Sequence, residues 1–286
     1  MEIHRRQRGM IMDRERIILN GLKVDDYISP EESKMLLSGD MPLVTKGLDM
    51  LNDVCVSLVQ RLTLGRHIEI TKETAPDLYH IIEDVCTIMD YTPVPKVYVC
   101  HQPAQELFCA GTDHNQITFS DYLLEKFDED MLYFAFGELI AMFKGGHTRL
   151  STVCYLIPPI PEALPLKLPL LAYLRAADLS SDRGGLLACQ SFTAAARCIL
   201  WDAGIPMSEM SGKSEEEMIQ LVRDYIASVK AVSPELLGEI ATSWKKWNME
   251  SMPHVYRLEQ LLKWYQEGYH EVVAKWKQDS GKMVRV

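Results

Sequence analysis

The sequence lacks the excess of positive charge that a nucleic-acid-binding protein needs. It has 30 lysines and arginines against 40 acidic residues, which gives a formal net charge of −10. Because a phosphate backbone is bound by a positive surface, we expect no nucleic-acid partner. The basic cluster at residues 4–8 is most simply a solvated chain end.

Paired cysteines are also missing. The seven cysteines are scattered, and none forms a Cys-x-x-Cys pair. This pattern is typical of small buried side chains in a reducing compartment, not of a disulfide framework or a zinc ribbon. The N-terminal residues contain no apolar signal core, so we expect a cytoplasmic protein.

No long apolar run is free of helix breakers. The most apolar segment, residues 153–174, contains five prolines together with Glu162 and Lys167. Prolines interrupt the hydrogen bonding of a helix, and a membrane span needs about 20 mostly apolar residues. We therefore expect no membrane span.

What the sequence does contain is mainly helical periodicity. Apolar residues recur at intervals of three and four, which predicts amphipathic or buried helices. A proline followed by two acids at residues 30–32 marks a further helix start. A polar pair, Gln190-Ser191, predicts a break between two helices. The segments with the helical pattern are residues 46–64, 74–89, 122–127, 131–143, 170–199, 215–226 and 256–276.

Shorter segments have the composition of strands. Residues 96–100 are β-branched and aromatic, and residues 67–70 resemble them. Residues 106–110 and 116–119 flank a turn-rich stretch, which predicts a β-hairpin in the same sheet. The fold class expected from the whole pattern is α+β, mostly helical.

Three segments also fall into the pattern of one known family. The first is residues 95–99 followed by residues 106–111; the second is residues 127–147, which include Gly137-Glu138-Leu139-Ile140-Ala141; the third is residues 174–187. A fainter match covers residues 252–257 and Trp264. On these residues the chain resembles the zinc metallopeptidases related to HtpX and the CAAX prenyl protease.

The resemblance implies a zincin-like fold, in which a small β-sheet lies beside the active-site helix. It implies that residues 70–286 are a metallopeptidase-like domain, preceded by an N-terminal helical extension at residues 1–69. The family binds zinc through the two histidines of His-Glu-x-x-His and a later glutamate. In this chain those ligand positions carry Gly137, Ala141 and Asp178, while Glu138 keeps the position of the general base.

Two of the three ligand positions therefore have no donor side chain. A structural zinc site with four ligands is worth roughly 10–16 kcal/mol, or about 3 kcal/mol per ligand. Losing two ligands should cost roughly 6 kcal/mol, a factor of more than about 10⁴ in affinity. We expect no metal cofactor here, with Glu138 as a vestigial base.

Two alternatives stay open for the charged residues. In the first, zinc binds a site rebuilt from Glu138, Asp178 and His147, and the protein is a metal-dependent endopeptidase or another hydrolase. In the second, the charges are structural: Glu138 and Asp182 pair with Arg175 or Arg183, and Gly137 allows a neighbouring helix to pack closely.

The leading hypothesis is a catalytically inactive pseudo-peptidase that binds a peptide or protein partner. The hairpin would offer its edge to an extended peptide through main-chain hydrogen bonds, with contacts from Glu106, Phe108, Gln116 and Thr118. A third possibility is a structural subunit of a complex. It would use aromatic anchors, the candidates being Trp244, Trp247, Trp264 and Trp276.

Overall fold

The computed structural model describes residues 15–37, 67–101, 107–110, 115–156, 164–232, 252–279 and 283–284. None of the helices in these ranges is long and apolar enough to cross a membrane. The α-helices are α2 (Pro30–Leu37), α4 (Pro76–Ile88), α5 (Asp121–Lys126), α6 (Glu129–Lys144), α7 (His147–Leu156), α8 (Leu164–Cys189), α9 (Phe192–Asp202), α10 (Glu215–Val232), α12 (His254–Trp264) and α13 (His270–Asp279). The strands are β1 (Arg16–Ile17), β2 (Ile68–Ile70), β3 (Lys96–Cys100), β4 (Leu107–Ala110), β5 (Gln116–Ser120) and β6 (Met283–Val284).

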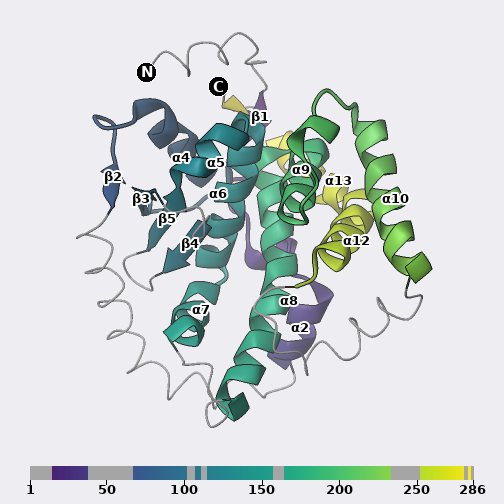
Figure 1. The fold of residues 1–286 in the computed structure, drawn as a ribbon. Helices are drawn as coiled ribbons and strands as arrows, with labels where there is room; N and C mark the ends of the chain where they lie inside the picture. The colour runs from purple at the N-terminus through teal and green to yellow at the C-terminus, as the bar shows by residue number, and fades with distance from the viewer. Residues whose placement is uncertain are drawn as a thin grey trace.

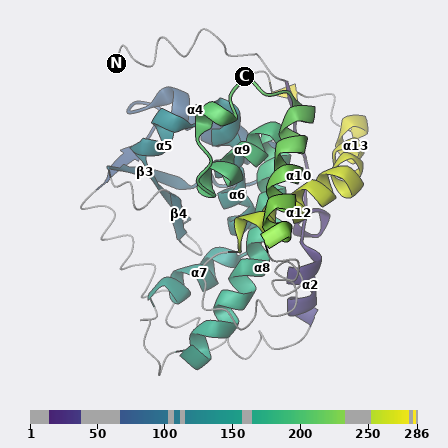
Figure 2. The same ribbon diagram turned by 45° about the vertical axis from the view of Figure 1, so that its right-hand side comes forward.

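Helices α6 and α8 form the centre of the molecule. They lie side by side and make the most extensive contact between any two described elements. The four strands β2 to β5 lie on one side of this pair, and α9, α10, α12 and α13 lie on the other (Figure 1). Seen after a turn of 45°, α10 and α12 run next to each other along the outside (Figure 2). The expected α+β class with helix in excess is confirmed.

The sheet has the strand order β2-β3-β5-β4. Strands β4 and β5 are antiparallel, with Leu107 opposite Phe119, so the predicted hairpin is confirmed. Strand β3 pairs with β5 in parallel and with β2 in antiparallel orientation. The sheet meets the central helices through Phe119 of β5, whose ring contacts that of Phe136 on α6 edge to face at 5.6 Å.

Helix α6 covers the predicted segment 131–143 and extends slightly beyond it at both ends. Asp128 caps its first turn by accepting a hydrogen bond from the amide of Met131, which satisfies one of the free N–H groups at a helix start. The helix ends at Lys144, because Gly145 is its C-cap and Gly146 has a φ of +71°. Its apolar side chains, from Met131 to Phe143, belong to the main core.

Helix α8 starts at Leu164, six residues before the expected helix. Pro165 lies in its first turn, where an N–H group would have no partner within the helix. The predicted break at Gln190-Ser191 is confirmed: Gln190 has a φ of +51° and Ser191 caps α9. The side chain of Gln190 also bonds the backbone of Ile17 at both N–H and C=O, which ties β1 to the end of α8.

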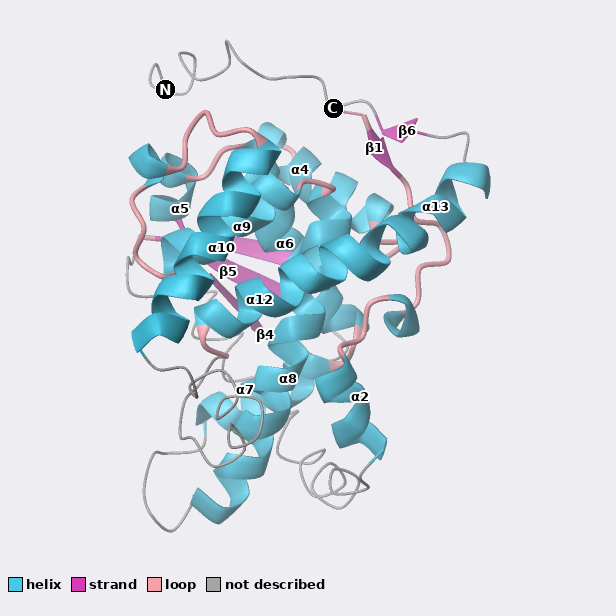
Figure 3. Cartoon of the chain, turned by 90° about the vertical axis from the view of Figure 1, so that its right-hand side faces the viewer, coloured by secondary structure: helices cyan, strands magenta, loops and turns pink. Residues whose placement is uncertain are grey.

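The described part of the expected N-terminal extension packs into the same core as the later helices. Leu19, Leu22 and Tyr27 are buried in the main hydrophobic cluster. Strand β1 pairs with β6, which lies near the other end of the chain (Figure 3). The expected domain boundary between residues 69 and 70 falls inside β2. The expected helix at residues 46–64 lies outside the described residues.

Candidate functional site

The family's ligand positions on α6 lie where this helix touches α8 most closely. A Cβ atom built on Gly137 would lie 2.4 Å from the Cβ of Ala188 and 3.0 Å from the Cα of Gly185. A Cβ on Gly184 would lie 2.2 Å from the Cβ of Ala141. The two helices therefore approach through a contact made almost wholly of glycine and alanine, which confirms the close packing expected at Gly137.

These residues do not fit a zinc ion held in the family's manner. Neither Gly137 nor Ala141 has a donor atom, and Ala141 is fully buried. The space that two imidazole rings and an ion would need is filled by the backbone and methyl groups of α8, because even one added methyl group would collide. Positions 137 and 141 therefore supply no metal-based chemistry.

Glu138 points to a third helix. Its Oε1 accepts a hydrogen bond of 2.7 Å from Nη2 of Arg257, a residue of α12. The same guanidinium bonds Asp182 on α8, with Nε 3.1 Å from both carboxylate oxygens and Nη2 2.5 Å from Oδ1. The three side chains are 17%, 11% and 1% exposed for Glu138, Arg257 and Asp182. Glu138 is therefore one of the acids in a largely buried ion-pair network.

Two further carboxylates belong to this network, which we call the Arg257 cluster. Nη1 of Arg257 lies 3.7 Å from Oδ2 of Asp202, at the end of α9. Asp178, one helical turn before Asp182, accepts a hydrogen bond of 2.9 Å from the amide of Met252. All four acids of the cluster thus face residues 252–257, the segment that begins α12.

Burial raises the pKa of three acids in this cluster. It raises the pKa of Glu138 well above the usual range of a glutamate; Arg257 opposes this rise and Asp182 adds to it. It also raises the pKa of Asp178 to about 6, with Arg257 again acting in the opposite direction. The pKa of Asp202 is raised for the same reason. The raised pKa and the hydrogen bond from Arg257 together make Glu138 a poor candidate for a free general base.

The arginines that we expected to neutralise Glu138 face other groups. Arg183 donates to the carbonyl of Ile28 at 2.9 Å, and its guanidinium lies 5.2 Å from the ring centre of Trp264. It follows Asp182 directly, so it lies about 100° further round α8. Arg175 is fully buried; burial lowers its pKa although the nearby Asp178 raises it. The ion pair that the structure gives Glu138 is with Arg257, a residue outside the two expected candidates.

His147 is engaged elsewhere. Its Nε2 lies 2.7 Å from Oε1 of Glu32 on α2, and both side chains are almost completely buried. Ser180 and Tyr173 also donate to this carboxylate, at 2.5 Å and 3.2 Å. Burial alone would raise the pKa of Glu32, but these bonds and the charge of His147 lower it.

This arrangement does not favour the rebuilt metal site. Over the part of the chain that the structure describes, no group of three or more His, Cys, Asp or Glu side chains could hold a metal ion. Glu138 and Asp178 are engaged by Arg257 and Met252, and His147 by Glu32.

The expected peptide-contacting residues divide between an edge strand and an inner strand. Gln116 and Thr118 are buried on β5, which pairs with β3 on one side and β4 on the other. Glu106 lies outside the described residues, as does the side chain of Phe108. Strand β4 has a strand partner on one side only, so among the described strands at this end its backbone forms the edge.

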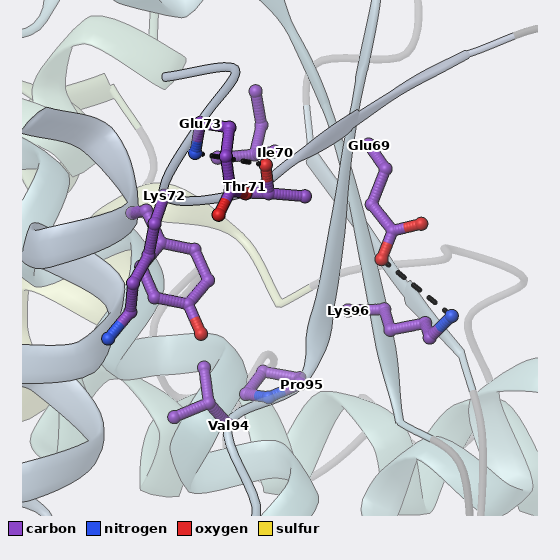
Figure 4. A pocket seen from close by; sticks show the side chains of 9 residues that line it. Glu69, Ile70, Thr71, Lys72, Glu73, Val94, Pro95 and Lys96 are labelled. Atoms are coloured by element: carbon purple, nitrogen blue, oxygen red, sulfur yellow. Dashed lines mark hydrogen bonds and ion pairs between the residues drawn. The ribbon is translucent and has the colours of Figure 1, made fainter. Parts of the chain in front are cut away.

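A hollow of about 320 Å³ opens elsewhere, between the start of α4 and the approach to β3 (Figure 4). Each of the two lysines that line it lies close to a glutamate. Lys96 lies 3.7 Å from Glu69, and Lys72 lies 2.9 Å from Glu83. A second hollow of about 390 Å³ lies between α10 and α12. Neither one contains a residue of the Arg257 cluster.

Comparison with known proteins finds partial sequence relatives. A protease HtpX homologue from Streptococcus uberis is 30% identical over 87 residues, which are 30% of this chain and 29% of that protein. One from Limosilactobacillus reuteri is 31% identical over 81 residues, which are 28% of this chain and 27% of that protein. A third, from Streptococcus pneumoniae, is 28% identical over 87 residues. No protein-family model and no solved structure matches the chain.

These matches support the resemblance to HtpX-like metallopeptidases. They cover only 27 to 29% of the length of these relatives. The activity, substrates and partners of the whole relatives are therefore matters for proposal.

The main residue that sequence reasoning missed is Arg257. The faint family match at residues 252–257 contained it, but only the folded chain shows that it reaches Glu138, 119 positions earlier. Of the candidate aromatic anchors, Trp264 is buried, Trp276 packs partly buried against the core, and Trp244 and Trp247 lie outside the described residues.

Proposed function

We propose that this chain is a metallopeptidase-like protein that does not hydrolyse peptides and instead binds a peptide or protein partner. The observation that carries the proposal is the contact at Gly137: the first ligand position has no donor, and a single added carbon would lie 2.4 Å from Ala188. A water molecule cannot be activated by a metal that has no place to bind. Arg257 and burial further remove Glu138 from the role of base.

The partner would bind as an extended strand along β4. This strand has one strand partner in the sheet, and an edge strand offers free N–H and C=O groups to a peptide. Its antiparallel pairing with β5 holds β4 in the sheet without help from a ligand.

The absence of hydrolysis is tested by metal content and activity together. The full chain is purified without chelator, incubated with equimolar zinc, dialysed and subjected to elemental analysis. Hydrolysis of an unfolded protein is measured for the natural chain and for Glu138→Gln. We expect zinc well below one ion per chain and equal background hydrolysis. Stoichiometric zinc with hydrolysis that Glu138→Gln abolishes would overturn the proposal.

The binding edge is tested with a matched pair of proline variants. Successive N–H groups along an antiparallel strand point to opposite sides. Phe108→Pro and Cys109→Pro therefore each remove one N–H group, and only one of the two faces the open edge. We expect one variant to lose affinity for extended peptides selected from a library and to keep its fold. If both retain full affinity, β4 is not the binding edge.

A second candidate function is acid catalysis through Glu138. Burial raises the pKa of this carboxyl well above the usual range of a glutamate, which favours the protonated form that a general acid needs. The protein would then be a hydrolase or another enzyme that uses Glu138 without the family's metal chemistry. A reaction lost in Glu138→Gln while the unfolding midpoint stays unchanged would support this candidate against the first.

A further inference from the structure

We propose that the Arg257 cluster is a guanidinium site that the chain fills with its own arginine, and that this contact seals Glu138 beneath residues 252–257. The inference concerns the cluster alone and needs no peptide partner. It therefore stands or fails independently of the proposed function.

The geometry suits a guanidinium and no other natural cation. Arg257 uses Nε and Nη2 on Asp182, shares Nη2 with Glu138, and turns Nη1 toward Asp202. The carboxylates come from three different helices, α8, α6 and α9, and converge on one planar group. A guanidinium has five N–H donors in a fixed fork, whereas an ammonium is a compact point charge. The site is therefore built for the shape of the cation as well as for its charge.

The cluster depends on this cation because its acids are buried. Asp182 is 1% exposed and Glu138 is 17% exposed. A buried carboxylate is costly unless it is paired and hydrogen-bonded. Of the two arginines on α8, Arg183 donates to the carbonyl of Ile28, and Arg175 is fully buried with Asp178 as a nearby charge. The hydrogen bonds of a cation to Asp182 and Glu138 come from Arg257 of α12.

The same contacts hold a segment of chain over the acids. Met252 donates its amide to Asp178 at the start of the segment, and Arg257 binds Asp182 at its end. Between them, Tyr256 is buried and donates to Glu31 of α2 at 3.1 Å. Both ends of residues 252–257 are therefore fixed to α8 at positions one helical turn apart. A ligand can take the place of Arg257 at Oε1 of Glu138 only after this segment has lifted.

The test is chemical rescue of Arg257→Ala in the full chain. Truncation removes the guanidinium and leaves a space of its shape among the acids. We expect a marked fall in the melting temperature, and a partial recovery when millimolar guanidinium chloride is added. The recovery should saturate with concentration, as occupation of one site requires. Sodium chloride at the same ionic strength should give no recovery.

The matched control is Lys263→Ala, which removes an exposed cation from the same helix. Its melting temperature should be close to that of the natural chain and should not rise when guanidinium is added. Hydrogen exchange supplies an independent measurement of the seal: the amide of Met252 should exchange much faster in Arg257→Ala and slow again with guanidinium. Arg257→Ala without saturable rescue, or with unchanged exchange at Met252, overturns the proposal.

A triple variant keeps the test decisive if Arg257→Ala does not fold. Arg257→Met with Glu138→Gln and Asp182→Asn removes the cation together with the two acids that bind it most closely. Replacing a buried ion pair by neutral groups is often close to neutral in stability. We expect the triple variant to fold, and its melting temperature should not rise when guanidinium is added. If it fails to fold as well, Arg257 acts through its packing and not its charge, and the proposal is wrong.

Discussion

Replacing Gly137 by alanine adds one carbon at the tightest point of the α6–α8 contact. Carbon atoms in good contact lie about 3.5–4.0 Å apart, whereas the new Cβ would lie 2.4 Å from that of Ala188. A second neighbour, 3.0 Å away, is the backbone Cα of Gly185, which no side-chain rotation can move. The helices must therefore separate by more than about 1 Å, and the surrounding core must adjust.

The magnitude follows from two opposing effects. Overpacking of a close-packed core costs about 1–3 kcal/mol, and the clash with backbone places Gly137→Ala at the upper end. Alanine gains about 1 kcal/mol over glycine in a helix interior. We expect a net loss of about 1–2 kcal/mol in the free energy of unfolding, measured by urea denaturation followed by far-ultraviolet circular dichroism.

A compensating change on the facing helix provides the control. Ala188→Gly removes the nearest methyl group and should cost about 1 kcal/mol by itself. In the double variant the two residues exchange sizes, so its loss should be smaller than the sum of the single losses by about 1 kcal/mol. A Gly137→Ala protein as stable as the natural chain, or strict additivity in the double variant, would refute the close-contact account.

Four further variants compare buried charged or polar groups with exposed ones. Burial raises the pKa of Asp178 from its usual 3.8 to about 6, so the folded state holds this proton more tightly and stability falls as the pH rises from about 4 to about 6. Asp178→Asn keeps an oxygen for Met252 and should be more stable than the natural chain at pH 7.5, by at most about 3 kcal/mol at 1.36 kcal/mol per pKa unit. Calorimetry should show a clearly larger gain at pH 7.5 than at pH 4.5. His147→Ala leaves the buried Glu32 without one of its hydrogen-bond partners and should cost about 1–3 kcal/mol in thermal unfolding. His80→Ala, at an exposed contact with Glu83, should have the same unfolding midpoint as the natural chain. Lys230→Met breaks an exposed ion pair with Glu259 and should change the free energy of unfolding by less than about 1 kcal/mol in urea.

Local patterns were enough to predict most elements of the described chain. The hairpin of β4 and β5 and the break at Gln190 each depend on residues within a few positions of one another. Helix α8 was placed less well because its first turns contain prolines, which argue against a helix when only neighbours are considered.

Pairings between distant residues could not be predicted in the same way. Several arginines are compatible with Glu138, and only the packing of α12 against α8 selects Arg257. The bond between Glu32 and His147 joins residues 115 positions apart and depends on where α2 meets α7 and α8. The sequence shows only that a buried acid needs a cationic or hydrogen-bonding partner, and the fold determines which residue that partner is.

The glycine and alanine contact between α6 and α8 also has a consequence for how this chain can change. Histidines at positions 137 and 141 would have to displace Ala188 and the backbone at Gly184 and Gly185. A histidine introduced at only one of these positions would therefore destabilise the packing of α6 against α8 without completing a metal site. A metal centre would need simultaneous substitutions on both helices, so the contact makes stepwise recovery of the site unfavourable.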